Sequence, residues 1–233
     1  MDHETIDAGT LSVREIYQLM TDLVAPRPIA WVSTQDETGR RNLAPFSYFQ
    51  AVCSHPPMIV IACSWHPDGR PKDTLRNILA TGELVVNHTC RTLAAAMNAT
   101  SGDYPPEIDE WQEVARIGVA TLTPVASSRV SPPRIGQAAA ALECRLVHAI
   151  PLGEGRPGRP SSTLVVAEVV AFQLAPGLVR RDARGRMVAI DPARLDAVGR
   201  LGGIAYTDTS GRFDLARPNL PSRPCGPENG IDA

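Results

Sequence analysis

The chain has 233 residues, of which 43% are hydrophobic and 21% charged, and its formal net charge is −2. This balance is typical of a globular domain and argues against nucleic acid or an anionic membrane as a partner. No apolar run approaches the roughly 18 residues that span a bilayer, the first residues are acidic, and the five cysteines form no CxxC pair, so we expect a cytoplasmic protein.

A helix and three strands are predicted for the first third of the chain. Ser12 and Glu15 form a capping box, and apolar residues follow them at helical spacing. The next segment predicts a hairpin whose returning strand is interrupted at Pro45, and an apolar strand covered on both faces comes after it. These elements are expected over residues 12–24, 27–34, 41–53 and 57–64, with a turn at 35–39.

Lys72 is the only lysine, because the other 22 basic residues are arginines. It lies in a loop after Ser64 that leads into a helix, for which Asp73 is the expected N-cap. Helical N–H groups, a compact ammonium and the Thr74 hydroxyl complement a phosphate dianion. The sequence therefore predicts a phosphate site, although a codon bias that turned other lysines into arginines would explain the same observation.

The rest of the chain predicts short elements and two long antiparallel strands. Residues 100–133 predict an excursion over the surface that covers a pocket, with a helical turn at 109–115. A last short helix has Asp191 as its N-cap and ends at Gly202 or Gly203. The other expected elements are a strand at 83–87, a helix at 91–99 and the long strands at 138–150 and 162–174.

The predicted fold class is mainly β, an antiparallel barrel with peripheral helices. Six or so strands joined chiefly by hairpins do not alternate with helices as in a doubly wound sheet. No polar linker divides the chain, so one domain is expected over residues 1–213. Residues 214–233 are rich in proline and predict an arm or a disordered tail.

Common catalytic motifs are absent, since the chain has no GxGxxG, GxxxxGK[ST], HExxH or GxSxG pattern. Cys53 with His55 and Cys63 with His66 form a CxH and a CxxH pair that could supply four metal ligands. Structural zinc sites usually show tighter paired spacing. We therefore expect two core cysteines, two histidines in proline turns, and no metal site.

Polar side chains are frequent on the first hairpin. Pro45 has no N–H, which leaves neighbouring backbone groups available to a ligand. The alternative is an edge hairpin with a solvated face. The polar residues are Ser33, Thr34, Asn42, Ser47 and Tyr48.

Five short sequence motifs occur in order between residues 26 and 87. They are Pro-Arg-Pro-Ile-Ala-Trp-Val-Ser-Thr, Asn-Leu-Ala-Pro-Phe-Ser-Tyr-Phe, Pro-Pro-Met-Ile-Val-Ile, Lys-Asp-Thr-Leu-Arg-Asn-Ile and Leu-Val-Val-Asn. In this succession the chain resembles the flavin reductase-like family, FMN-binding split barrels that include flavoredoxin and the reductase components of two-component monooxygenases. The likeness covers residues 25–87 and continues more loosely to residue 203. It departs from the family pattern at Gly136-Gln137 and in the length of the 100–133 segment, which leaves the substrate side open.

The resemblance implies an FMN site. Its phosphate would meet Lys72, Thr74 and Ser64, its ribityl chain would follow residues 44–48, and its ring would lie over residues 31–34. Asp73 would cap the helix. The implied cofactor residues are Trp31, Ser33, Thr34, Asn42, Ala44, Pro45, Phe46, Ser47, Tyr48, Ser64, Lys72, Asp73, Thr74 and Asn87. On the substrate side the resemblance points to Arg134, Arg200 and Tyr206, although a surface ion pair and a plain helix end would explain these residues too.

The activity that the resemblance implies is that of an FMN-dependent oxidoreductase, in which NADH or NADPH reduces the flavin for a partner such as a monooxygenase. One alternative is a flavoenzyme that retains FMN and acts on a small organic substrate; another is a non-enzymatic electron carrier. FAD also fits a pocket for one phosphate. Family members form homodimers, which would build each flavin site between two chains.

Overall fold

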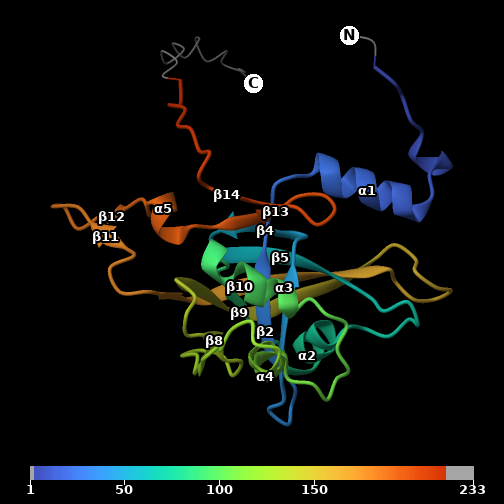
Figure 1. Ribbon diagram of the computed structural model, residues 1–233, viewed down its shortest axis with the longest axis horizontal. Helices are drawn as coiled ribbons and strands as arrows, with labels where there is room; N and C mark the ends of the chain where they lie inside the picture. Colours follow the sequence, from blue (N-terminus) through green and yellow to red (C-terminus); the bar gives the residue numbers. More distant parts are fainter. Residues whose placement is uncertain (1–2, 219–233) are drawn as a thin grey trace, which may run out of the picture.

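The computed structural model describes residues 3–218, and a seven-stranded antiparallel sheet forms its centre (Figure 1). The strand order is β3-β2-β6-β9-β10-β5-β4. The strands are β2 (Ala30–Gln35), β3 (Arg41–Phe46), β4 (Phe49–Ser54), β5 (Pro57–Ser64), β6 (Glu83–Asn87), β9 (Ala140–Leu152) and β10 (Ser162–Leu174). The predicted mainly β, antiparallel class is confirmed.

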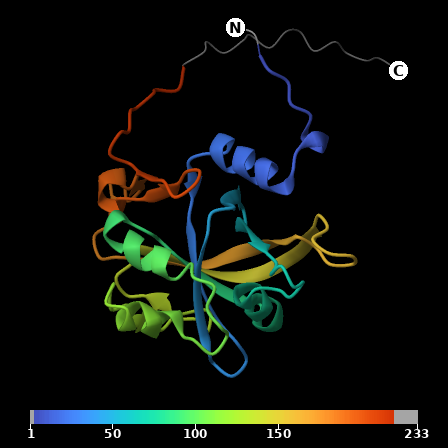
Figure 2. The ribbon, with the colours of Figure 1, turned by 45° about the vertical axis from the view of Figure 1, so that its right-hand side comes forward.

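Five α-helices lie around this sheet within residues 3–218. They are α1 (Val13–Leu23), α2 (Asp73–Thr81), α3 (Ala94–Ala99), α4 (Glu110–Arg116) and α5 (Pro192–Leu195), with 3-10 turns at Ala8–Thr10 and Arg91–Leu93. In both ribbon views α1 lies at the opposite end of the molecule from α2 and α4 (Figure 2). No helix among the described residues is long and apolar enough to cross a membrane.

Three small sheets complete the fold of residues 3–218. One joins β1 (Arg27–Pro28), β13 (Val198–Arg200) and β14 (Tyr206–Asp208). The others pair β7 (Pro124–Val125) with β8 (Arg134–Ile135), and β11 (Arg180–Arg181) with β12 (Met187–Val188). The first matters for function, because it brings the C-terminal part of the chain to the start of β2.

Several elements form as their local sequence predicts. Ser12 caps α1, and the side chain of Glu15 accepts a hydrogen bond from the Ser12 backbone N–H, which completes the capping box. Asp191 caps α5, with Pro192 in its first turn. The long strands β9 and β10 pair antiparallel over most of their length.

Helix α2 is fixed on the sheet by its apolar face. Leu75 and Ile78 are fully buried and pack in one cluster with Val32 of β2 and Val86 of β6. Burial of each such side chain contributes about 1.5–3 kcal/mol. The N-terminus of α2 is therefore held beside the first hairpin.

The expected returning strand over 41–53 is wrong, because this segment forms two strands with different partners. β3 pairs with β2, and Pro45 lies within it opposite Trp31. The break falls at Ser47 and Tyr48, after which β4 pairs with β5. Proline is tolerated inside β3 because β3 is an edge strand and needs no N–H on its outer side.

The 100–133 segment is only partly a surface excursion. Its predicted helical turn is confirmed as α4, capped by Asp109. However, Trp111, Val114 and Leu122 are buried in a second core cluster with Trp31 of β2. The buried apolar side chains make this segment part of the core, which corrects the expectation of a surface path.

Smaller corrections concern the end of α5 and the burial of residues on β4 and β5. α5 ends at Leu195, with Asp196 as a left-handed C-cap, and not at Gly202 or Gly203, because the chain then continues into β13. In β5 only one face is fully buried, and Cys53 of β4 is exposed, whereas Cys63 lies in the core. Most of the predicted tail, residues 219–233, lies outside the described residues.

Candidate functional site

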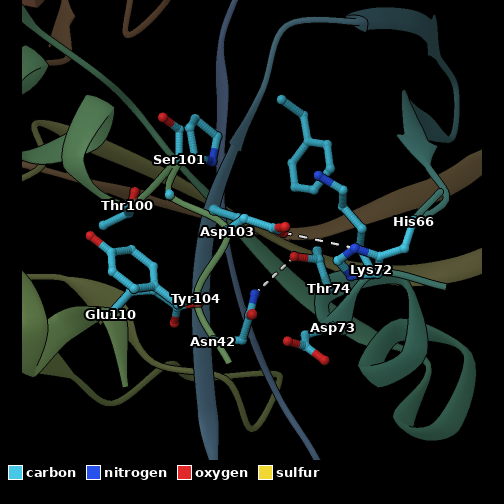
Figure 3. Close-up of a pocket in the computed structure, with 14 residues that line it drawn as sticks. Asn42, His66, Lys72, Asp73, Thr74, Thr100, Ser101, Asp103, Tyr104 and Glu110 are labelled. Carbon is cyan, nitrogen blue, oxygen red and sulfur yellow. Dashed lines mark hydrogen bonds and ion pairs between the residues drawn. The ribbon is translucent and has the colours of Figure 1, made fainter. Parts of the chain in front are cut away.

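A cleft, here called the first cleft, lies between the edge strand β3, the N-terminus of α2 and the loop that precedes α4 (Figure 3). Residues far apart in the sequence meet there because β3 and α2 both pack on β2. Its lining residues are Asn42, Ala44, Pro45, Phe46, His66, Lys72, Asp73, Thr74, Thr100, Ser101, Gly102, Asp103, Tyr104 and Glu110.

Lys72 occupies the N-cap position of α2 with an extended backbone, and no side chain caps this helix. The N–H groups of the first turn therefore lack a side-chain acceptor at the cap. Within residues 3–218, no carboxylate lies within ion-pair distance of the Lys72 ammonium, although nine ion pairs form between arginines and carboxylates. An ammonium and a helix N-terminus thus face the first cleft together.

The prediction that Asp73 caps α2 is wrong by one position. Asp73 is the first helical residue, and its carboxylate forms an ion pair with Arg76 on the next turn. An acidic side chain in the first turn still stabilises the helix, because its negative charge interacts favourably with the positive end of the helix dipole. Thr74 follows and is buried, with its hydroxyl at the cleft wall.

Asn42 connects β3, α2 and α4. With the side-chain amide oriented to satisfy both of its ends, its oxygen accepts a hydrogen bond from Thr74 Oγ1 at 2.8 Å and its nitrogen donates to Glu110 Oε1 at 3.2 Å. The other oxygen of Glu110 accepts from the Leu43 backbone N–H at 3.0 Å. One buried polar chain therefore runs from the α2 N-terminus to α4.

Glu110 is only 7% exposed, and burial raises the pKa of its carboxyl to about 7. The negative charges of Asp109 and Asp73 raise this pKa further, while the Leu43 N–H lowers it. This acid therefore changes charge near neutral pH, inside the wall of the first cleft.

Two loops complete the walls of the first cleft. His66 Nδ1 and Asp103 Oδ1 are 3.8 Å apart, which links the loop before α2 to the one before α4. Figure 3 shows Asp103 reaching from its loop across the cleft towards His66, which lies beside Lys72.

A second cleft adjoins the first, and the two share Pro45, Phe46 and Ser101 in their walls. The small sheet of β1, β13 and β14 brings Arg200 and Tyr206 to this second cleft. Its lining residues are Tyr17, Ile29, Pro45, Phe46, Ser47, Met97, Asn98, Ser101, Arg200 and Tyr206.

The structure thus brings many of the predicted residues together. Those in the first cleft are Asn42, Ala44, Pro45, Phe46, Lys72, Asp73 and Thr74, and those in the second are Pro45, Phe46, Ser47, Arg200 and Tyr206.

Four predicted residues on β2 and β6 point into the protein and line neither cleft. Trp31 donates from Nε1 to Thr100 Oγ1 at 2.9 Å, and Thr34 accepts from Asn77 Nδ2 at 3.2 Å. Ser33 and Asn87, both fully buried, also form internal hydrogen bonds. Ser33 Oγ donates to the carbonyl of Pro133 at 2.5 Å, and the Asn87 amide binds the Trp31 carbonyl, Ser33 Oγ and the Ile135 N–H.

Three further predicted residues lie elsewhere. Ser64 is exposed at the end of β5, opposite Ser162. Tyr48 is 42% exposed and lines neither cleft. Arg134 lines a separate pocket with Gln173.

Sequence reasoning missed the half of the first cleft that comes from residues 100–110. Glu110 precedes Trp111, which is buried. An acidic residue next to a core tryptophan was the one sequence feature that could have indicated a buried carboxyl here. Tyr104 lies in a proline-rich loop without periodicity, and nothing local marks it. Within residues 3–218, no cluster of three or more His, Cys, Asp or Glu could hold a metal ion.

Comparisons with known proteins agree with this geometry. Residues 23–190 match the family model described as the flavin reductase like domain. The chain is 32% identical to nitrilotriacetate monooxygenase component B from Bacillus cereus, with a TM-score of 0.82, covering 92% of this chain and all of that one. It is 31% identical to 2-nitrobenzoate 2-nitroreductase from Pseudomonas fluorescens, with a TM-score of 0.76, covering 94% and 99%.

A third solved structure has a similar fold. A flavin reductase with a split barrel domain from Shewanella frigidimarina has a TM-score of 0.71 at 22% identity, covering 91% of this chain and 96% of that one. At this identity the likeness concerns the fold alone. The expected split-barrel architecture is confirmed.

Proposed function

The chain belongs to the flavin reductase-like family. On that premise we propose that it is an FMN-dependent oxidoreductase, and that NADH or NADPH reduces its flavin. The observation that carries the proposal is the first cleft, where Lys72, free of carboxylate partners within residues 3–218, meets the N-terminus of α2. Helical N–H groups and an ammonium together suit the terminal phosphate of FMN.

Different residues of the chain would hold the phosphate, the ribityl chain and the ring of FMN. Lys72 and the first N–H groups of α2 would hold the phosphate, while the Thr74 hydroxyl, which donates to Asn42, would line the site without donating to the phosphate. Residues 44–47, which line the junction of the two clefts, would hold the ribityl chain and the ring. Because β3 is an edge strand, its outer backbone groups remain available to a ligand.

FMN, when bound, supplies the hydride chemistry itself. The protein then has three tasks. It would orient the flavin through Lys72 and β3, offer a second molecule access through the second cleft, and form one wall of the first cleft with the loop that carries Tyr104. No acid-base pair of side chains is needed for hydride transfer.

The partner and assembly belong to the same proposal. We assign the chain to the cytoplasm, as a source of reduced flavin or electrons for a monooxygenase or another acceptor. Helix α1 supports a homodimer, because Val13, Met20 and Leu23 are 85%, 50% and 78% exposed on it and Tyr17 of the same helix lines the second cleft. FAD would use the same phosphate contacts as FMN.

A second candidate function is a flavoenzyme that retains FMN and acts directly on a small organic substrate. The second cleft favours it, since three aromatic rings and one arginine line a space beside the proposed ring site. Such a lining is typical of small-molecule pockets.

Anaerobic reduction separates these functions. The purified protein is titrated with FMN, freed of excess flavin, and mixed with NADH or NADPH while the flavin absorbance is recorded. A reductase bleaches the flavin with one of the two and turns over added free FMN. Retained flavin with little turnover of free FMN would indicate the second candidate, and no bleaching by either nucleotide would contradict the proposal and indicate an electron carrier.

A further inference from the structure

The second cleft carries a positive charge that the proposed phosphate site does not use. Among its ten lining residues Arg200 is the only cation, and none is Asp or Glu. The first cleft differs, because Asp73, Asp103 and Glu110 all line it. The two adjoining clefts therefore have different electrostatic character.

Arg200 is held in one orientation. It lies on β13 directly opposite Tyr206 of β14, and its guanidinium carbon is 4.4 Å from the centroid of the tyrosine ring. One guanidinium nitrogen donates to the Gly203 carbonyl at 2.5 Å. Tyr206 is fixed in turn, since its hydroxyl donates to Asn98 Oδ1 at 2.9 Å.

The remaining N–H groups of Arg200 have no acidic partner within residues 3–218. Two carboxylates lie on nearby elements, and neither is within ion-pair distance of Arg200: Asp22 of α1 lies against Gly202 and accepts from Gln18 at 2.6 Å, and Asp208 of β14 pairs with Arg91. A planar cation with free donors therefore faces the second cleft, already stacked and oriented.

A second guanidinium, that of Arg27, lies on the strand next to Arg200. Arg27 is 5% exposed and lies opposite Arg200 in the pairing of β1 with β13. It donates to the backbone carbonyls of Thr21, Val24 and Leu201, and its Nε lies 3.4 Å from Ser47 Oγ at the cleft wall. These partners are carbonyls and a hydroxyl, and no carboxylate within residues 3–218 pairs with Arg27, although Asp22 of α1 lies close by, against Gly202.

The other walls suit a flat apolar body. Tyr17, Phe46 and Tyr206 contribute aromatic rings, and Ile29 and Met97 contribute apolar side chains. Aromatic side chains bind planar rings by stacked or edge-to-face packing.

We propose that the second cleft binds a planar aromatic carboxylate, with its ring among Tyr17, Phe46 and Tyr206 and its carboxylate on Arg200. This inference rests on the proposed function, because the cleft joins the proposed flavin site at Pro45 and Phe46. It adds the chemical class of the second ligand. Arg200 determines this specificity through a charge-assisted, two-pronged hydrogen bond.

The test compares two ligands of the same shape. Benzoate and benzamide differ in charge but hardly in size, and each is titrated into the FMN-loaded protein at saturating FMN while the flavin absorbance bands and the heat of binding are recorded. Loss of a charge-assisted hydrogen bond weakens binding about tenfold or more. We expect benzoate to bind at least about tenfold tighter than benzamide, and the preference to vanish in Arg200→Met. Arg200→Lys keeps the charge without the planar fork and should keep part of the preference.

Arg156→Met is the matched control, because Arg156 lines a different pocket and donates to the Pro67 carbonyl. It should leave the preference unchanged. Equal binding of benzoate and benzamide, tighter binding of benzamide, or an unchanged preference in Arg200→Met would overturn the inference while leaving the flavin proposal standing. If the protein takes up no FMN, the proposed function fails instead, and calorimetry without flavin still measures whether the cleft prefers the carboxylate.

Discussion

Glu110 makes the stability of the protein depend on pH near neutrality. The carboxyl is buried and its pKa rises from 4.5 to about 7 in the folded chain. Below about pH 4.5 it is protonated in both the folded and the unfolded chain. As the pH rises from about 4.5 through 7 the unfolded chain loses this proton first, so the folded state is progressively destabilised, by about 3 kcal/mol once the pH exceeds 7.

Glu110→Gln removes this titration. Glutamine is nearly the same size as the protonated acid, and its side-chain oxygen can still accept from the Leu43 N–H. We expect the free energy of unfolding of the variant, relative to wild type, to increase by up to about 3 kcal/mol between pH 5 and pH 8. Urea unfolding at pH 5, 6, 7 and 8 measures it.

Glu113→Gln is the matched control on the same helix. An ion pair with Arg116 lowers the pKa of Glu113, so its charge is constant over this pH range and the difference from wild type should stay flat. A difference between Glu110→Gln and wild type that does not change with pH would show that Glu110 is ionised throughout, and the reasoning about its burial would be refuted.

Three other substitutions test the internal polar contacts. Asn87→Ala leaves the buried Ile135 N–H without its acceptor and should lower the free energy of urea unfolding by about 3 kcal/mol; a loss below 1 kcal/mol would contradict its role. Trp31→Phe deletes the hydrogen bond to Thr100 and should cost about 1 kcal/mol in the same assay, with an unaltered midpoint as the contrary result. Ser12→Ala removes the cap of α1 and should accelerate amide exchange there by the equivalent of about 1 kcal/mol, which unchanged exchange rates would disprove.

Features set by local chemistry could be predicted from the sequence. The capping box at Ser12 and the Asp191-Pro192 pair use groups within three residues of each other, and both form as predicted. Lys72 could be singled out as a candidate phosphate ligand because it is the only lysine in the sequence. The helix start after it was misplaced by one residue, since the Asp73 carboxylate pairs with Arg76 instead of capping.

Features set by distant partners could not be predicted in this way. The polar side chain of Ser33 on β2 indicated a ligand, but it donates to Pro133, which is 100 residues away. Asn87 similarly accepts from the N–H of Ile135, 48 residues away. Glu110 enters the first cleft only because α4 packs against β3. In each case the tertiary fold supplies the partner that the local sequence does not show.

Lys72→Met tests the central claim most directly, when FMN and riboflavin are titrated into wild type and variant. Riboflavin lacks the phosphate, so a lysine that holds the phosphate affects only FMN. We predict that the dissociation constant for FMN rises about tenfold or more while that for riboflavin stays within about twofold. Unchanged FMN affinity in the variant, or equal weakening of both ligands, would contradict a phosphate site at Lys72.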